Sequence, residues 1–330
     1  GYIYDRKVIE QLREQDVQVE LISLSGNFPN PSSADQDDAQ ISLAQLESNS
    51  PVIIDGLALG ALDTDLLNSI PAPIIALVHH PLAKEGGLDD MDQERLFKTE
   101  SRNLERASKI IVPSSYTASV LASEYGVDQG LIAIARPGFD LSIRPRQPID
   151  PPLIVSVGIQ VPRKGHDVLL KSLSKIIHLP WQAVIAGSPR DEDYAQELRK
   201  LRSELNLESR VQLVGHVDSQ QLADYYSKAS VFALATRHEG YGMVFDEAMA
   251  YGLPIVSCDS GAVSETVGNQ AASLVTPDSP ELFAEALSRV LEQADIYQAM
   301  SEAALQRAAG FGSWETTAKL FIEALDGLCK

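Results

Sequence analysis

Short apolar runs alternate with helical stretches along most of this chain of 330 residues. After a helical start at Val8 to Leu12, the apolar runs of the first part are Val17 to Leu24, Val52 to Ile54, Ile74 to Val78, Lys109 to Val112 and Leu131 to Ala135. Helical spacing separates them, as at Gln93 to Ala107 and Thr117 to Tyr125. Strands that alternate with helices form a parallel sheet covered by helices. The pattern therefore predicts an α/β domain.

A segment with four prolines, Arg144 to Pro152, interrupts the alternation. It can continue neither a helix nor a central strand, so we expect an interdomain linker there. The alternation then restarts with expected strands at Leu153 to Val157, Gln182 to Ala186, Val211 to Val214, Val231 to Ala235 and Pro254 to Ser257. We predict an N-terminal domain over residues 1–150 and a second doubly wound domain over 151–312. A mainly helical stretch runs from Pro280 to Leu328.

Composition narrows the class of protein. A formal net charge of −19 repels nucleic acids and anionic lipids, so we expect no nucleic-acid partner. Cys258 and Cys329 are too few for a disulfide framework and lack zinc-site spacing, which favours a cytoplasmic location. No apolar run approaches the roughly 20 residues of a transmembrane helix. The residues from Gly1 to Arg6 do not have the pattern of a signal peptide, so we expect none here, and we expect native residues to precede Gly1.

Two open α/β domains can face each other across a cleft, and the segment from Arg237 to Pro254 is the most informative candidate lining. A predicted strand ends, a glycine-bearing turn follows, and a short helix begins near Met243. Backbone N–H groups at the start of this helix favour an anion or sugar oxygens. The carboxylates of Glu239 and Glu247 could each hold a vicinal diol. The alternative is an ordinary solvated acidic helix face.

Glu239 and Glu247, with Gly240, Tyr241 and Gly242 between them, resemble the E-x(7)-E motif of glycosyltransferase family 4, retaining enzymes of GT-B fold. Further resemblances extend over nearly the whole chain and are most specific from 153 to 268. They are the phosphate-binding loop at Val157 to Asp167, the P-x-G-x-D segment at Pro137 to Asp140, the nucleobase stretches at Ala186 to Ser188 and Val211 to Val217, and a final helix from Trp314, over 313–330, that returns to the first domain.

The resemblance implies a GT-B fold with two Rossmann-like domains facing a central cleft and a retaining transfer from a UDP- or GDP-linked sugar. It implies no metal and no cofactor, an acceptor that is a small molecule, a glycan or a lipid, and leaves the oligomeric state open. The implied donor-binding residues are Gly158, Arg163, Lys164, Gly187, Val214, Gly215, Glu239, Gly240, Tyr241, Gly242, Met243, Val244 and Glu247. Among these, the resemblance implies catalytic roles for Arg163, Lys164 and Glu239.

The charges of the loop after Gly158 suit this chemistry. Cleavage of a sugar–phosphate bond places negative charge on the diphosphate, which an enzyme without a metal must stabilise with fixed cations. Arg163 offers a bidentate fork and Lys164 a point charge. The chain has Ile159 where many family members have arginine after the glycine, so Arg163 must supply the phosphate-binding guanidinium. A solvated basic turn is the alternative.

The first domain contributes histidines at the end of an expected strand. His79 resembles the family histidine near the donor sugar and is our catalytic candidate, with His80 as an alternative on the acceptor side. A zinc site is less favoured because no third ligand has suitable spacing. The start of the chain resembles the glycine-rich acceptor loop of the family, which makes Gly1, Tyr4 and Arg6 acceptor-side candidates. The alternative is an ordinary amphipathic helix start.

Two rival functions remain at this stage. A nucleotide-sugar epimerase of the same plan would bind the donor and need no acceptor, and a non-catalytic protein would bind the sugar nucleotide without turnover. A dinucleotide oxidoreductase is disfavoured because neither domain has G-x-G-x-x-G after its first strand. We read the acidic pairs at Asp63 to Asp65 and Asp191 to Asp193 as helix starts rather than metal sites.

Overall fold

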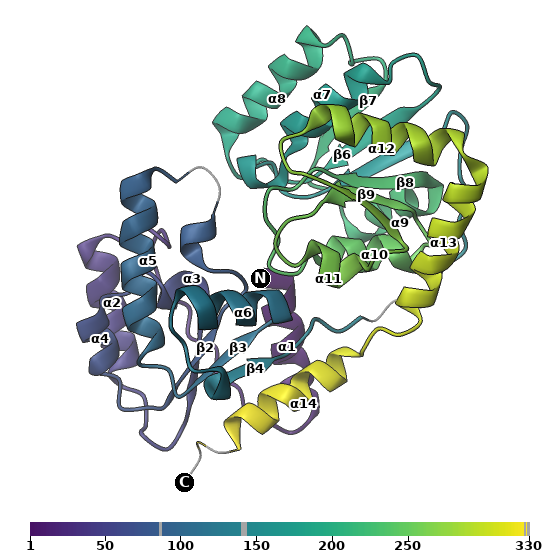
Figure 1. Ribbon diagram of the computed structural model, residues 1–330. Coiled ribbons are helices and arrows are strands. Elements are labelled where there is room, and N and C mark those ends of the chain that lie inside the picture. Colours follow the sequence, from purple (N-terminus) through teal and green to yellow (C-terminus); the bar gives the residue numbers. More distant parts are fainter. Residues whose placement is uncertain (86–87, 140–143, 327, 329–330) are drawn as a thin grey trace. The chain divides into compact units, whose positions relative to one another are not determined.

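The computed structural model describes residues 1–85, 88–139, 144–326 and 328. The chain divides into two compact units, shown in Figure 1. The first comprises Gly1–Asp140 and Gly312–Lys330, and the second comprises Leu141–Phe311.

The first unit is built on a parallel sheet with the strand order β1-β2-β3-β4. Its strands are β1 (Val52–Asp55), β2 (Ile74–Leu77), β3 (Lys109–Val112) and β4 (Ile132–Ile134). Its helices are α1 (Tyr2–Glu14), α2 (Ser33–Leu43), α3 (Gly56–Leu59), α4 (Thr64–Asn68), α5 (Asp90–Leu104), α6 (Ser115–Glu124) and α14 (Trp314–Leu325), with short 3-10 turns η1 (Leu82–Lys84) and η2 (Gln129–Leu131). Strand β2 is buried along its whole length, as a continuous apolar run predicts.

The expectation of a strand at Val17 to Leu24 is wrong, because the structure has no strand there. Apolar and polar residues alternate in this segment, and its side chains alternate in burial over part of its length. Alternation alone does not make a strand, since the backbone must also find a neighbouring strand to complete the ladder. None of the described strands pairs with this segment.

The C-terminal helix joins the first unit, as expected from the resemblance at Trp314. Figure 1 shows α14 beside α1. The start of α14 packs closely against Gly138, where an added Cβ would lie 2.1 Å from the backbone nitrogen of Trp314. Phe139 N donates a hydrogen bond of 2.9 Å to Gly312 O in the same contact. A glycine is therefore required where the returning segment packs.

The second unit contains a parallel sheet of six strands in the order β10-β9-β8-β5-β6-β7. The strands are β5 (Leu153–Val157), β6 (Gln182–Ala186), β7 (Val211–Gly215), β8 (Ala229–Leu234), β9 (Ile255–Cys258) and β10 (Ala272–Val275). The helices are α7 (His166–Lys175), α8 (Glu192–Glu204), α9 (Ser219–Lys228), α10 (Met243–Ala250), α11 (Val263–Val267), α12 (Pro280–Glu292) and α13 (Ala294–Ala308), and η3 (Pro162–Lys164) is a 3-10 turn. Sequence analysis missed β10, a short edge strand that is only partly buried.

The direction of the strand order changes between β5 and β8. The chain adds β6 and β7 on one side of β5, then returns to place β8, β9 and β10 on the other side. Ligands of open α/β sheets bind outside the carboxyl ends of the strands at such a switch point. The loops that follow β5 and β8 are therefore the place to look for a site.

Side-chain caps start several helices. The hydroxyl of Ser32 accepts a hydrogen bond from Asp35 N at the start of α2, and Asp218 caps α9 in the same reciprocal manner with Gln221. Ser313 caps α14. Each cap satisfies a backbone N–H that the first turn of a helix leaves without a partner.

The proline-rich segment lies along the second unit. Its backbone hydrogen bonds run from Arg144 N to Ala250 O, from Gln147 N to Ser227 O and from Ile149 N to Lys228 O. The division between the units accordingly falls at 140/141, ahead of this segment and not within it. Asp140, the last residue of the family-like P-x-G-x-D segment, lies outside the described residues.

The sheet of the second unit has an apolar core on each face. Trp181 anchors one of these cores and is buried. Its indole Nε1 donates a 2.7 Å hydrogen bond to Ile176 O, and the guanidinium of Arg210 lies 3.8 Å from its ring centroid. Along the described part of the chain, no helix has both the length and the apolar character that crossing a bilayer demands.

Candidate active site

The loops after β5 and β8 are joined by hydrogen bonds at the switch point. Arg237 N donates to Arg163 O at 2.8 Å, and the Thr236 hydroxyl oxygen lies 3.1 Å from the same carbonyl oxygen. In return, Arg163 Nη1 donates to His238 O at 3.0 Å. These contacts connect residues more than 70 positions apart in the sequence. They hold the predicted phosphate loop against the predicted sugar-binding turn.

Lys164 and Glu239 form a buried ion pair between the two loops. Lys164 Nζ lies 2.6 Å from Glu239 Oε1, with side-chain exposures of 12% and 6%. The hydroxyl of Thr236 donates to the same oxygen at 3.1 Å, and Arg163 Nη1 lies 3.8 Å from Glu239 Oε2. Burial alone would raise the pKa of Glu239, but the charges of Lys164 and Arg163 outweigh it and lower that pKa. Two cations face one carboxylate, so the cluster retains a positive charge.

The side chain of Arg237 holds the loop that carries Arg163 and Lys164 in place. Its guanidinium binds the carboxylate of Asp167 through two 3.0 Å hydrogen bonds and that of Asp278 through one of 2.8 Å. It also donates to the carbonyl of Pro162, the residue before Arg163. Sequence analysis did not single out Arg237 or Asp167. The sequence feature that could have indicated Arg237 is its position directly before the predicted sugar-binding turn.

Glycines allow the loops to approach each other. An added Cβ at Gly187 would lie 1.8 Å from Gly158 O, so only glycine fits where the loops after β5 and β6 meet. The aliphatic part of Lys164 lies against Gly158, 3.2 Å from the position of an added Cβ. Gly187 N donates to Gly215 O at 2.7 Å. Three of the five predicted donor-binding glycines thus lie side by side at the ends of β5, β6 and β7, where Val214 is partly buried beside Gly215.

His166 supports this arrangement from the start of α7. Its ring Nε2 lies 3.1 Å from Gly158 O, and the side chain is fully buried. Burial lowers its pKa to about 4, so the ring is neutral at physiological pH and Nε2 donates to the carbonyl.

The helix α10 begins where the predicted sugar-binding turn ends. Gly242 is its N-cap with φ +91°, and no side chain caps the helix. The backbone N–H groups of Met243 and Val244 occupy the first turn, where a helix supplies no carbonyl partner. Tyr241 O accepts a 2.7 Å hydrogen bond from the hydroxyl of Thr266, which fixes the turn after Gly240. The helix start therefore presents donors suited to sugar or phosphate oxygens.

Glu247 lies one turn into α10 and contacts Tyr226. The Tyr226 hydroxyl donates to Glu247 Oε2 at 2.9 Å, and the tyrosine is buried. Burial raises the pKa of Glu247, and the hydrogen bond from Tyr226 opposes that shift. In the described structure, Glu247 makes no ion pair with Lys164 or Arg163. Tyr226 is a further residue that sequence reasoning missed, and only its place in a helical stretch was visible.

In the first unit, His79 lies between two aspartates. His79 Nε2 is 2.7 Å from Asp5 Oδ1 and 3.4 Å from Asp55 Oδ2. Asp55 is the last residue of β1, and His79 follows the neighbouring β2. Spacing in the sequence offered no third ligand near the histidines, and the structure corrects this. One ligand atom from each of Asp5, Asp55 and His79 lies within 4.8 Å of the others, close enough to hold a metal ion.

Of the acceptor-side candidates, the structure places Tyr4 in the core of the first unit. Tyr4 is 1% exposed, and its hydroxyl donates to Ala135 O at 2.7 Å, so it belongs to the core and not to an acceptor surface. Its position on the buried face of α1 explains the correction. Arg6 is exposed and lies 3.7 Å from Glu10. His80 Nε2 lies 2.7 Å from Glu85 Oε2.

Gly1 lies against the His79 ring, because an added Cβ would be 3.0 Å from His79 Cδ2. Gly1 and His79 are therefore the predicted first-unit residues that the structure brings together.

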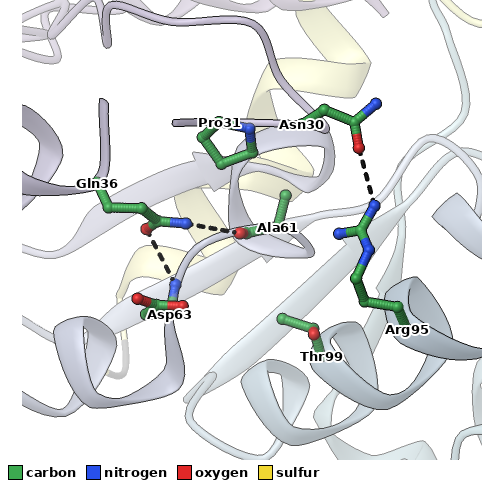
Figure 2. A pocket seen from close by; sticks show the side chains of 7 residues that line it. All are labelled: Asn30, Pro31, Gln36, Ala61, Asp63, Arg95 and Thr99. Carbon is green, nitrogen blue, oxygen red and sulfur yellow. Dashed lines mark hydrogen bonds between the residues drawn. The ribbon is translucent and has the colours of Figure 1, made fainter. Parts of the chain in front are cut away.

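A separate hollow of about 340 Å³ lies in the first unit, away from these residues (Figure 2). Its polar groups bind one another. The side-chain amide of Gln36 donates a hydrogen bond to Ala61 O and accepts one from Asp63 N. The guanidinium of Arg95 donates hydrogen bonds to the side chains of Asn30 and Asp92. None of the predicted site residues lines it. The amide of Gln36 and the guanidinium of Arg95 already have partners within the protein, so these groups supply no argument for a ligand.

The profile of the family described as glycosyl transferases group 1 matches residues 141–307, more than half of the chain and both loops of the switch point. The chain belongs to the glycosyl transferases group 1. This membership agrees with the resemblance that the E-x(7)-E motif and the loop from Val157 to Asp167 show to family 4 glycosyltransferases.

Two curated relatives show what similar group 1 proteins do. A D-inositol 3-phosphate glycosyltransferase 2 of Catenulispora acidiphila is 28% identical over 250 residues, covering 70% of this chain and 58% of that protein. A GDP-mannose-dependent alpha-(1-6)-phosphatidylinositol monomannoside mannosyltransferase of Mycobacterium tuberculosis is 30% identical over 237 residues, covering 65% of this chain and 60% of that protein. The chain thus spans less than two thirds of the length of these relatives.

Solved structures support the fold. Sucrose-phosphate synthase from Thermosynechococcus elongatus has a TM-score of 0.81 at 22% identity, over 99% of this chain and 93% of that one. Anabaena HepE in complex with UDP and glucose has a TM-score of 0.73 at 18% identity, over 97% and 89%. The expected GT-B class, with two parallel α/β sheets, is confirmed.

Proposed function

We propose that this protein is a retaining glycosyltransferase that moves a sugar from a nucleotide diphosphate donor to a hydroxyl-bearing acceptor without a metal ion. The observation that carries the proposal is the contact between Lys164, Arg163 and Glu239 at the switch point of the second unit. It combines cations for a diphosphate with a carboxylate for a sugar in one small cluster.

The cations stabilise the leaving diphosphate. When the donor binds, its phosphate oxygens bring negative charge to a cluster that already holds an excess positive charge. Arg163 and Lys164 are held by backbone hydrogen bonds and by the Arg237 network, so they need little rearrangement as charge develops on the phosphate. The start of α10 adds backbone donors.

The carboxylates bind hydroxyl groups. Glu239, adjacent to the cations, accepts hydrogen bonds from the transferred sugar together with the N–H groups of the turn that follows. Glu247, held by Tyr226, accepts hydrogen bonds from the ribose. The leaving phosphate then assists attack by the acceptor on the same face of the sugar, which retains the anomeric configuration.

The printed names of similar proteins support a nucleotide-linked donor. The mycobacterial relative is described as GDP-mannose-dependent, and the HepE structure contains UDP and glucose. We therefore propose a UDP- or GDP-linked sugar as the donor for this protein.

Ligand-induced stabilisation tests the donor site. UDP, GDP and their sugar conjugates are screened by thermal unfolding, and a ligand at 100 times its Kd adds roughly 2.7 kcal/mol of stability. Lys164→Met is expected to abolish the shift. Lys175→Met, at an exposed lysine on α7 that pairs with Glu281, is the matched control and keeps it. Absence of any shift across the panel contradicts the proposal.

Product analysis tests the reaction. Incubation of the responding donor with a panel of glycans, polyols and lipid acceptors is expected to give a product with the anomeric configuration of the donor, in the presence of EDTA. Accumulation of an epimerised free donor identifies an epimerase instead. Binding without transfer to any member of the panel identifies a sugar-nucleotide-binding protein.

A further inference from the structure

Tyr241 is the only residue with a side chain between Glu239 and Met243, because a glycine stands on each side of it. Glycine leaves the backbone many conformations, so this turn depends on its contacts for a fixed shape. The carbonyl oxygen of Tyr241 accepts a 2.7 Å hydrogen bond from the Thr266 hydroxyl. At the other end of the residue, the phenol hydroxyl is hydrogen-bonded to the carboxyl group of Asp246.

The carboxyl group of Asp246 is buried in the first turn of α10. Its side chain is 3% exposed. The Oδ1 atom is buried and has no hydrogen-bond partner among the residues that the structure describes, so the bond from Tyr241 goes to Oδ2. A buried carboxyl oxygen without a partner lowers stability, and such groups are found where a functional site requires them. Asp246 stands next to Glu247, at the start of the helix that follows the predicted sugar-binding turn.

We propose that Asp246 is a positioning residue of the donor site, which fixes the turn before α10 through the hydroxyl of Tyr241. The backbone N–H groups at the start of α10 thereby keep their direction toward the donor. The proposal rests on the proposed glycosyltransferase function, which assigns this turn to the sugar and the diphosphate. It adds a residue between the two glutamates of the E-x(7)-E motif to which the family resemblance assigned no role.

The second contact of Tyr241 is anchored by two further helices. Arg307, in the last turn of α13, donates hydrogen bonds to the main-chain carbonyls of Glu265 and Thr266 on α11. The hydroxyl that holds the carbonyl of Tyr241 therefore belongs to a segment that is itself held in place. Elements of the second unit alone fix Tyr241 at its main chain and at its side chain.

The groups that act on the charge of Asp246 come from three places. Burial raises the pKa of Asp246 to about 7, the hydrogen bond from Tyr241 and the charge of Arg307 lower it, and the charge of Glu247 raises it. Two other elements pack against α10. They are α11, where the carbonyl of Glu265 binds Arg307, and β9, where Cys258 belongs to the core on the opposite face of the sheet.

This charge makes the positioning role visible in the pH dependence of donor binding. A carboxyl oxygen accepts a hydrogen bond from Tyr241 whether the group is neutral or ionised, so the turn stays fixed as the proton leaves. The ionised form places a negative charge in the first turn of α10, where it opposes the binding of a diphosphate. Affinity for the donor is therefore highest below pH 7 and falls as the pH rises through 7.

Calorimetric titrations with UDP-glucose and with GDP-mannose at pH 6 and pH 8 test the role, because the diphosphate of a sugar nucleotide does not titrate in this range. The Kd of the wild type is expected to rise about 2- to 5-fold from pH 6 to pH 8. Asp246→Asn keeps an acceptor for Tyr241 without a charge, and is expected to retain the pH 6 affinity of the wild type at both pH values. Asp246→Leu removes the acceptor and is expected to weaken binding about 2- to 10-fold at both.

The matched control is Asp224→Asn, the same change at an exposed aspartate of α9 that pairs with Lys228. It is expected to keep the affinity and the pH dependence of the wild type. Tyr241→Phe removes the same hydrogen bond from its other side and is expected to weaken binding as much as Asp246→Leu. The double variant Tyr241→Phe/Asp246→Leu is expected to lose no more affinity than either single variant, since one bond is lost in all three.

Urea unfolding without a nucleotide measures the Tyr241–Asp246 pairing by itself. The midpoint shifts of Tyr241→Phe and Asp246→Leu are expected not to add in the double variant.

The proposal is overturned if Asp246→Asn shows the same pH dependence of Kd as the wild type, or if the losses of affinity in the double variant add. If the wild type binds neither sugar nucleotide, the donor site fails and the positioning role fails with it. Non-additive urea midpoints then locate that failure in the proposed function and not in the pairing of Tyr241 with Asp246.

Discussion

Replacement of Lys164 by methionine removes the partner of a buried carboxylate. Glu239 is 6% exposed, and its 2.6 Å contact to Lys164 is the shortest of its interactions with charged groups. Removal of one partner of a buried ion pair costs about 3–5 kcal/mol. Arg163 remains 3.8 Å away and the Thr236 hydroxyl still donates, so we expect the lower end, about 3 kcal/mol.

Glu239→Gln alone is expected to cost less, about 1–2 kcal/mol, because the flexible lysine can extend its ammonium group toward water. The double variant Lys164→Met/Glu239→Gln removes both the ammonium and the carboxylate, so it leaves neither one buried without its partner. It is expected to be more stable than the sum of the single effects predicts, with a coupling energy of about 2 kcal/mol.

Urea unfolding monitored by Trp181 fluorescence measures these values. The chain has two tryptophans, Trp181 in the core of the second unit and Trp314 in α14, so a Trp314→Phe background confines the signal to the second unit. With a urea m-value of about 1–3 kcal/mol/M, the Lys164→Met midpoint is expected to fall by 1 M or more. Single effects that add within about 0.5 kcal/mol refute the reasoning, because the two charges would then not interact.

The same pair predicts the pH dependence of stability. The folded-state pKa of Glu239 lies below its ordinary value of 4.5. The stabilisation is therefore present above the unfolded-state pKa and is lost as the pH falls through the folded-state pKa. Between pH 7 and pH 3, the wild type is expected to lose more stability than Glu239→Gln in the same urea assay. Equal losses contradict the assignment.

Three further predictions concern other parts of the chain. Tyr226→Phe removes the hydrogen bond to Glu247 and is expected to weaken nucleoside diphosphate binding about 2- to 10-fold by calorimetry, with less discrimination against the 2′-deoxy analogue. Gly165→Ala places a Cβ 1.9 Å from Ala235 O at φ +64° and is expected to cost at least about 2 kcal/mol, read from the urea midpoint. Burial raises the pKa of Glu100 to about 8, so stability falls as pH rises from 4.5 toward 8 by up to about 1.4 kcal/mol per unit, and Glu100→Gln is expected to remove this slope.

The described strands other than β10 could be predicted because each is a short apolar run between helical stretches. Expected and observed limits agree at Lys109 to Val112, Leu153 to Val157 and Gln182 to Ala186. The two failures have different physical causes. Val17 to Leu24 has the pattern of a strand without a described neighbour to pair with, and Ala272–Val275 has a neighbour but too little burial to leave a long apolar run.

The candidate site was predictable only where its residues form local motifs. The basic loop and the glutamate motif each stand within a few residues, so their chemistry was visible in the sequence. The contacts of Arg237 with Asp167, of Tyr226 with Glu247 and of Asp5 with His79 join residues far apart in the chain. Only the sheet topology brings them together, and periodicity carries no information about it.

The adjacency of β5 and β8 has a consequence during synthesis. The basic loop emerges from the ribosome with β5, but Thr236 and Glu239 follow β8, after two further strands have been made. A nascent chain that stops at Lys228 carries Arg163 and Lys164 without the carboxylate and the carbonyl that orient them. Under the proposed function, affinity for the nucleotide arises late in translation, when β8 inserts beside β5, and a tethered nucleotide would capture only chains that have passed this step.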